Sequence, residues 1–306
     1  MASGDATRLG ALGRGALGAL VAALAIGAAT AIGTLAEARF GIGGMAWHAL
    51  RALACSAVAV PLIVLLRRRL DRRTMAGLGL PDLRTGMRDF GLGALVTFGA
   101  AAAMLGLGHA LGWLRFGAVS WPVLLAFVAG NAAVALFYEA LPEELTLRGY
   151  AYRNLSAGLR RWTAALCTTL LFLAVPGLAS VFAAGLATLV GAPAPAISAT
   201  PAGQDPVAYL ILLTVFGFAL IVARVATGSL WTCIALHLSF LTINRISFFG
   251  DPDRTGWSAQ MTTPDALLLV PGYLLLTAAI FLLLPRLQRR RVGVGWRSRD
   301  PEPAQT

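Results

Sequence analysis

Long apolar segments of about 20 residues alternate with short polar or arginine-containing segments along most of the chain. An α-helix of that length crosses the hydrocarbon core of a bilayer. The pattern predicts eight spans, at residues 16–36, 45–66, 90–113, 121–142, 162–189, 207–224, 229–247 and 266–285. The fifth is the least regular, because Pro176 and Gly177 interrupt it. We therefore predict an all-α fold, a polytopic transmembrane helical bundle of about eight spans.

The composition supports a membrane protein. Of the 306 residues, 58% are hydrophobic and only 13% are charged, which is too apolar for the surface of a soluble domain of this length. A transmembrane barrel is not expected, because barrel strands alternate in character and are only about ten residues long. Several long apolar helices account for the excess of hydrophobic residues.

All 25 basic residues are arginine, and the net charge is +11. A basic balance can indicate nucleic-acid binding, but here the arginines lie mainly in predicted loops, where they set membrane orientation. With both termini cytoplasmic, the second, fourth and eighth of the even-numbered spans are each followed by an arginine-rich segment. These segments contain Arg67, Arg68, Arg69, Arg72, Arg73, Arg84 and Arg88, then Arg148, Arg153, Arg160 and Arg161, then Arg286, Arg289, Arg290 and Arg291. The opposite loops hold only Arg39, Arg115, Arg245 and Arg254.

The N-terminal segment allows two interpretations. Arg8 and Arg14 precede an apolar run and the residues "AEA", which resembles a secretory signal with a cleavage site. The run is longer than the apolar region of a typical signal, and further spans follow it. We favour an uncleaved first helix.

Three glutamates stand at the end of the fourth predicted span, in the stretch FYEALPEELTLRGY. A carboxylate at membrane depth is costly, so it is rare there without a partner or a function. Glu139 and Glu143 are four residues apart on one helical face, and Arg148 is four residues after Glu144, close enough to pair with it. This pairing leaves Glu143 free to take and give a proton. Pro142 removes one helical hydrogen bond and is expected to kink the helix.

A purely structural interpretation of this cluster is also open. The fourth span could simply end at the interface, with Glu144 and Arg148 as a surface ion pair. Alternatively, the three glutamates could form the proton relay of a carrier or channel.

The chain has three histidines, and His237 lies inside a predicted span. An imidazole there needs a partner inside the bundle, either a backbone carbonyl or a functional group beside the acids. We interpret His48 and His109 as structural. The three cysteines have neither disulfide-framework nor metal-ligand spacing and are expected to be small apolar residues: Cys55, Cys167 and Cys233.

Two blocks of the sequence resemble one known family. EELTLRGYAYRNL resembles the EExxxR signature of the CPBP family, the CAAX prenyl protease 2-like and bacteriocin-processing intramembrane proteases. FGFALIVARVATGSLWTCIALHLSF resembles the later block of that family, in which a helix bears an essential histidine. The resemblance implies a core at residues 75–250. Residues 1–74 would then add two helices and a basic loop, and residues 251–306 a last helix and a basic cytoplasmic tail.

The resemblance implies specific roles. Glu143 would be the base that activates water, Glu144 and Arg148 would support it, and His237 would be the histidine of the third family motif. The implied activity is cleavage of a membrane-embedded or lipidated peptide near the cytoplasmic face. The implied partners are therefore membrane lipid and such a substrate, with no nucleic acid. The use of arginine in place of lysine and the short chain, not the resemblance, favour a bacterial plasma membrane as the location.

The sequence departs from the family pattern twice. In the second motif, FxxxH, Phe172 is present but Pro176 stands at the histidine position. In the third motif, HxxxN, Leu241 stands at the asparagine position, and Asn244 comes seven residues after the histidine. A catalytically degenerate relative that binds or escorts a partner is therefore the alternative hypothesis.

The resemblance leaves the cofactor open, because a divalent metal such as zinc has been suggested for the family. A three-ligand zinc site would have to use Glu143, Glu144 and His237 as ligands. No separate base would then remain to activate the water. The sequence alone does not support such a site well.

Overall fold

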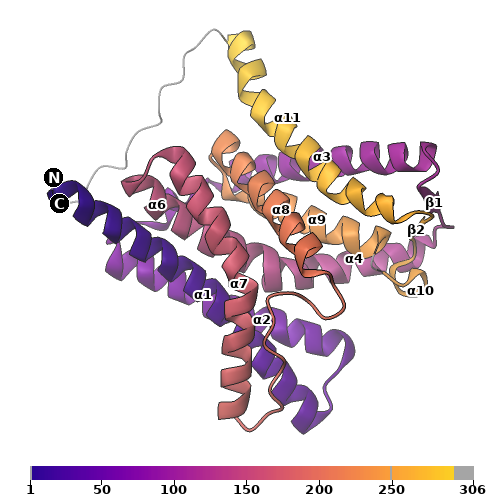
Figure 1. Cartoon of the computed structure of the whole chain (residues 1–306), viewed down its shortest axis with the longest axis horizontal. Coiled ribbons are helices and arrows are strands. Elements are labelled where there is room, and N and C mark those ends of the chain that lie inside the picture. The colour runs from indigo at the N-terminus through magenta and orange to yellow at the C-terminus, as the bar shows by residue number, and fades with distance from the viewer. Residues whose placement is uncertain (1, 249, 293–306) are drawn as a thin grey trace.

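The structure is a computed structural model, and it describes residues 2–248 and 250–292. Long helices dominate it (Figure 1), and the predicted all-α polytopic bundle is confirmed. They are α1 (Ala2–Phe40), α2 (Gly44–Leu65), α3 (Leu83–Ala110), α4 (Trp121–Ala135), α7 (Arg161–Leu189), α8 (Pro206–Thr227), α9 (Leu230–Ser247) and α11 (Leu269–Val292). Shorter helices are α5 (Leu141–Glu143), α6 (Tyr152–Gly158) and α10 (Pro252–Thr255). Most of the predicted basic tail, residues 293–306, lies outside the described residues.

Seven helical segments in the described part of the chain are long and apolar enough to cross a membrane. They are Thr7–Phe40, Gly44–Leu70, Met75–Ala110, Trp121–Gly158, Arg161–Leu189, Pro206–Thr227 and Pro264–Leu284. The chain is thus an integral, multi-pass membrane protein. The segment with Pro176 is one unbroken helix, α7.

The seventh predicted span, residues 229–247, is present as α9, but it is not among these seven apolar segments. Most of its residues are buried inside the protein, including His237, Ser239 and Asn244. A helix surrounded by other helices faces partner side chains instead of lipid, so it can carry polar groups that a lipid-facing helix cannot. The low hydropathy of α9 therefore follows from its central position.

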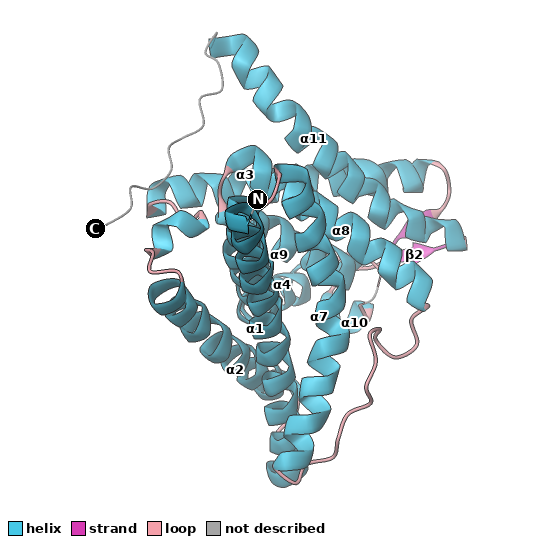
Figure 2. Ribbon diagram, turned by 60° about the vertical axis from the view of Figure 1, so that its left-hand side comes forward, coloured by secondary structure: helices cyan, strands magenta, loops and turns pink. Residues whose placement is uncertain are grey.

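The N-terminal helix α1 lies between α2 and α7 (Figure 2). Its buried face is built from small residues, which let helices approach closely in a membrane. At Gly27 a Cβ atom would lie 2.6 Å from the Cβ of Phe182 and 2.8 Å from the carbonyl oxygen of Ala179. Only glycine permits this approach of α1 to α7.

A two-stranded antiparallel sheet joins the loops after α3 and α10. It pairs β1 (Leu114–Phe116) with β2 (Ala259–Met261), and Leu114 is opposite Met261. The sheet was not predicted, because strands of three residues are too short to show an alternating pattern.

Many of the arginines that the orientation argument counted as loop charges lie in helical segments, among them Arg67, Arg148 and Arg245. Arg67 is fully buried, and its Nε donates to the carbonyl of Thr74 at 2.9 Å. Arg148 is also fully buried, and Arg245 belongs to α9. The exposed arginines after α2 still favour cytoplasmic termini, but the orientation stays a prediction.

Candidate active site

The helix that carries the three glutamates runs without a break from Trp121 to Gly158, but it is π-helical at 136–140 and 144–151. Pro142 lies between these wide turns and cannot donate a backbone hydrogen bond. The Thr146 hydroxyl donates to the carbonyls of Pro142, at 2.8 Å, and Glu143, at 3.0 Å. The sequence predicted a kink at Pro142; the chain instead stays helical and widens its turns. Such π turns are frequent at functional sites.

Glu144, Arg148 and His237 form one buried cluster. Oε1 of Glu144 accepts a hydrogen bond from Nη1 of Arg148 at 3.0 Å. The same oxygen lies 2.8 Å from Nδ1 of His237. The side chains of Glu144 and Arg148 are completely buried, and that of His237 is 3% exposed. The fold thus brings together two distant sequence blocks. The two bonded residues, Glu144 and His237, are 93 positions apart in the sequence.

Three charged-group atoms of this cluster have no hydrogen-bond partner in the described part of the chain. Oε2 of Glu144 has no hydrogen-bond partner among the described residues, and the same is true of Nε and Nη2 of Arg148. The guanidinium of Arg148 lies 4.4 Å from the ring centre of Phe172, in a cation–π contact. A buried ion pair with unsatisfied atoms is a weak source of stability.

Glu143 points to a different environment from that of Glu144. It lines a cavity of about 630 Å³ together with Glu139, Phe172, Pro176, His237 and Asn244. Because Nδ1 of His237 is engaged with Glu144, Nε2 is the ring nitrogen available to this cavity. A carboxylate and an imidazole nitrogen therefore border the same space.

The cavity lies toward the end of the bundle opposite the N-terminus. It is bordered by the loop residues between Pro195 and Gln204 and by the N-terminal half of α8. Toward the other end, residues 144–151 are all buried. If the termini are cytoplasmic, the cavity belongs to the external half of the membrane. The two predictions, cytoplasmic termini and a site near the cytoplasmic face, are therefore incompatible in this fold.

No second histidine lines this cavity among the described residues. The second-motif position is occupied by Pro176, which does line the cavity, four residues after Phe172. His109 lies near β1, with Nδ1 3.1 Å from the carbonyl of Leu114. His48 lines a separate pocket. Neither His48 nor His109 lines the cavity, so neither replaces the histidine that is absent from the second motif.

Asn244 lines the cavity although it is seven residues after His237. Helix α9 is continuous between them, so the two side chains are two turns apart on one face. Nδ2 of Asn244 donates to the hydroxyl of Tyr273 at 2.6 Å and to the carbonyl of Phe240 at 2.7 Å, while Oδ1 has no partner in the described part of the chain. The amide is therefore held in place by its nitrogen, and its oxygen is buried.

Two arginines near the site were not identified from the sequence. Arg245 Nη2 pairs with Oε1 of Glu139 at 2.5 Å and its Nη1 donates to Oδ1 of Asn131 at 2.9 Å. Its spacing from His237, eight residues along α9, could have indicated the shared face. Arg224 is buried, and its Nε donates to the carbonyl of Arg148 at 3.1 Å, which fixes the π-helical backbone. The position of Arg224 in the predicted apolar span 207–224 could have identified it, because an arginine in such a span is rare without a partner or a function.

The donor set does not fit a zinc site of three protein ligands. No group of three or more His, Cys, Asp or Glu side chains is arranged to hold a metal ion in the described residues. Cys55 and Cys233 are free thiols buried in the core. We therefore derive no reaction step through a metal.

Comparison with known protein families gives one match. Residues 126–243 match the model of a family described as Rce1-like, type II CAAX prenyl endopeptidase Rce1-like. The predicted resemblance to the CPBP family is thereby confirmed over this segment, which contains the glutamates, Arg148 and His237. No curated protein and no solved structure matches the chain.

Proposed function

We propose that this chain is an intramembrane endopeptidase that hydrolyses a membrane-embedded or lipidated peptide. The proposal combines the family match with the site at the junction of the two matched blocks. Glu143 would be the base, His237 would hold the water, and Glu144 and Arg148 would be positioning residues. Residues 75–250 would form the catalytic core.

The observation that carries the proposal is the hydrogen bond between Glu144 and Nδ1 of His237. An ionised carboxylate only accepts hydrogen bonds, so Nδ1 carries the proton and Nε2 presents a lone pair to the cavity. Arg148 supports the ionised state of Glu144. The buried cluster contributes little stability, which favours a functional reason for its presence.

The reaction then follows general acid–base chemistry. Water bound between Glu143 and Nε2 of His237 transfers a proton to the Glu143 carboxylate, while its oxygen bonds to the scissile carbonyl carbon. The carbon–nitrogen bond breaks, and Glu143 returns the proton to the departing amine. The products are a carboxylic acid and an amine.

Terminal proteomics of membrane fractions tests the proposal. We compare cells that carry the wild-type protein with cells that carry Glu143→Gln, which keeps the shape of the side chain but removes the base. Uncut precursors should accumulate with Glu143→Gln. The matched control is Glu37→Gln, an exposed glutamate near the end of α1, which should leave all termini unchanged.

An unchanged set of termini, with the Glu143→Gln protein at its normal level, would contradict the peptidase. The degenerate relative would then be favoured, because Pro176 and Leu241 stand where the family motifs have histidine and asparagine. Such a protein would use the same cavity to bind a partner without cutting it.

A further inference from the structure

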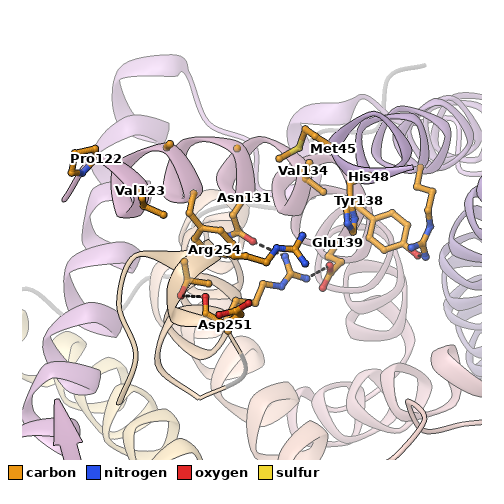
Figure 3. Close-up of a pocket in the computed structure, with 18 residues that line it drawn as sticks. Met45, His48, Pro122, Val123, Asn131, Val134, Tyr138, Glu139, Asp251 and Arg254 are labelled. Atoms are coloured by element: carbon orange, nitrogen blue, oxygen red, sulfur yellow. Dashed lines mark hydrogen bonds and ion pairs between the residues drawn. The ribbon is translucent and has the colours of Figure 1, made fainter. Parts of the chain in front are cut away.

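Beside the cavity of the proposed active site lies a larger one, of about 1040 Å³, between α2, α4 and α9. Figure 3 shows the residues that line it, from Pro122 at one end to Tyr138 at the other. Tyr138, Glu139 and Arg245 line both spaces. The larger cavity therefore belongs to the proposed active site.

A separate groove lies where α7, α8 and α11 meet. It has a volume of about 430 Å³, and among the described residues it shares no lining residue with the other two cavities. All three helices belong to segments that are long and apolar enough to cross a membrane. Several large side chains of the groove are exposed on the protein surface: Trp162, Leu166, Phe218 and Leu282. In a membrane protein such a groove opens toward lipid.

The inner part of the groove is suited to a hydrocarbon chain. Apart from Arg161, Thr169 and Thr214, the residues that line it are hydrophobic. The Thr169 hydroxyl donates to the carbonyl of Ala165 at 3.1 Å, and the Thr214 hydroxyl donates to that of Leu210 at 2.7 Å. Because both hydroxyl groups are bonded within their own helices, an apolar occupant deprives neither of a partner.

The groove has the length of one leaflet of a bilayer. It runs along α8 from Thr214 to Ala226, about 18 Å at a rise of about 1.5 Å per residue. A Cβ atom at Gly217 would lie 3.2 Å from Cγ2 of Thr169, and α7 lines the groove from there to Arg161. Half of the hydrocarbon core of a bilayer is about 15 Å thick. A chain that starts at Arg161 therefore ends near the membrane midplane.

Positive charge lies at the outer end of the groove. Arg161 lines it, Arg160 precedes it, and both side chains are exposed. Among the described residues no carboxylate lines the groove, no acid stands in the first turn of α7, and Arg160 forms no side-chain cap. The arginines and the first backbone N–H groups of α7 favour a phosphate at this position. The exposed ring of Trp162 lies beside it, as is common at a membrane interface.

This end of the bundle also carries the arginine-rich segment that follows α2. Nδ2 of Asn154 in α6 donates to Asp71 at 3.2 Å, and α6 leads directly into α7. The positive-inside rule favours the cytoplasmic side for such an end. Anionic lipids of the cytoplasmic leaflet then lie within reach of the groove.

We propose that this groove binds an anionic phospholipid, with one acyl chain between α7 and α8 and the phosphate at Arg160 and Arg161. The apolar part accepts an acyl chain of any lipid, so the arginines provide the preference for a negative headgroup. The bound lipid fills the space where the three helices meet. The site uses none of the proposed peptidase residues, and the inference holds whether or not the chain cleaves a peptide.

Quenching of Trp162 fluorescence by brominated lipids tests this proposal. The full-length protein is placed in phosphatidylcholine nanodiscs that contain a minor fraction of a lipid brominated near the headgroup end of its acyl chains. This lipid is either phosphatidylglycerol or phosphatidylcholine. The signal of Trp162→Phe is subtracted, so that the remaining fluorescence belongs to Trp162. Half-maximal quenching should need at least about tenfold less brominated phosphatidylglycerol than phosphatidylcholine, the effect of two arginines near an anionic headgroup.

Two double variants locate the contact. Arg160→Gln with Arg161→Gln should remove the preference for phosphatidylglycerol. Arg68→Gln with Arg69→Gln removes the same charge from another exposed pair at the same end of the bundle and should keep the preference. All four side chains are exposed, so both double variants should unfold at the temperature of the parent protein. Equal quenching of the parent protein by the two lipids would overturn the proposal, as would equal losses of preference in the two double variants.

A free anion and a second copy of the chain are the competing occupants. Excess inorganic phosphate should leave the quenching unchanged, because it cannot fill the apolar part of the groove. If phosphate displaces the brominated phosphatidylglycerol, the site binds a phosphate group alone and the proposal is wrong. The proposal is also wrong if neither brominated lipid quenches Trp162, and a dimer in the nanodisc would then identify a second copy as the occupant.

Discussion

Two glutamate–arginine pairs on the same long helix have opposite environments. Glu139 reaches across to Arg245 of α9, and the pair stands between two cavities with side chains 21% and 34% exposed. Glu144 pairs with Arg148 one turn further along its own helix, and both side chains are fully buried. The second pair also contacts a histidine, because Oε1 of Glu144 lies 2.8 Å from Nδ1 of His237.

The comparison shows how burial decides what an ion pair can do. A partly exposed pair can separate more easily, because water replaces each partner, and it contributes less to stability. A buried pair cannot separate without leaving an uncompensated charge in the protein interior. Glu139 and Arg245 are therefore suited to move aside for a ligand, whereas Glu144 and Arg148 are suited to hold His237 in one orientation.

The largest difference should come from removing the arginine of each pair. Arg148→Met should cost about 3–5 kcal/mol of unfolding free energy, because Glu144 is left charged and buried. Arg245→Met should cost less than about 1 kcal/mol. Unfolding of the two purified variants in a detergent titration measures both values. Similar losses in the two variants would mean that burial does not separate the pairs.

Replacing the histidine should affect chemistry more than stability. His237→Phe keeps a ring but removes the Nδ1 donor, which should cost about 1–3 kcal/mol of unfolding free energy. Cleavage should fall at least about a hundredfold, since the water loses one of its two holders. The readout is the rate for a substrate found by terminal proteomics, measured on protein that remains folded.

The matched control for that variant is His109→Phe. His109 stacks on Phe116 near the sheet, and its ring bonds a backbone carbonyl instead of an acid. It should keep full cleavage. If His109→Phe reduces the rate as much as His237→Phe, the role assigned to the buried cluster is wrong.

The sequence predicted the helical bundle well, because lipid demands long apolar segments that are visible without any knowledge of packing. It also predicted the pairing of Glu144 with Arg148, since four residues along a helix bring two side chains together. The family resemblance assigned His237 to the same site as the glutamates, but the contact of Glu144 with His237 was not predicted. Nothing local in either block fixes how two distant helices pack.

Other features depended on packing that a single sequence does not reveal. The π-helical turns around Pro142 require the surrounding helices to hold them, so local propensity predicted a kink instead. Arg245 was counted among the loop charges although the predicted span 229–247 includes it, and it lies inside α9. Its pairing with Glu139 joins positions 106 residues apart.

The smallest expected effect concerns Glu139 and Arg245, and it tests whether these two side chains can move apart. In a double-mutant cycle of Glu139→Gln and Arg245→Gln, the coupling free energy should be about 0.2–1 kcal/mol and should shrink in high salt, because salt screens exposed charges. The corresponding cycle of Glu144→Gln and Arg148→Met should keep its coupling at every salt concentration, since the buried charges are not screened. A salt-insensitive coupling would show instead that Glu139 and Arg245 form a fixed partition between the two cavities that they line.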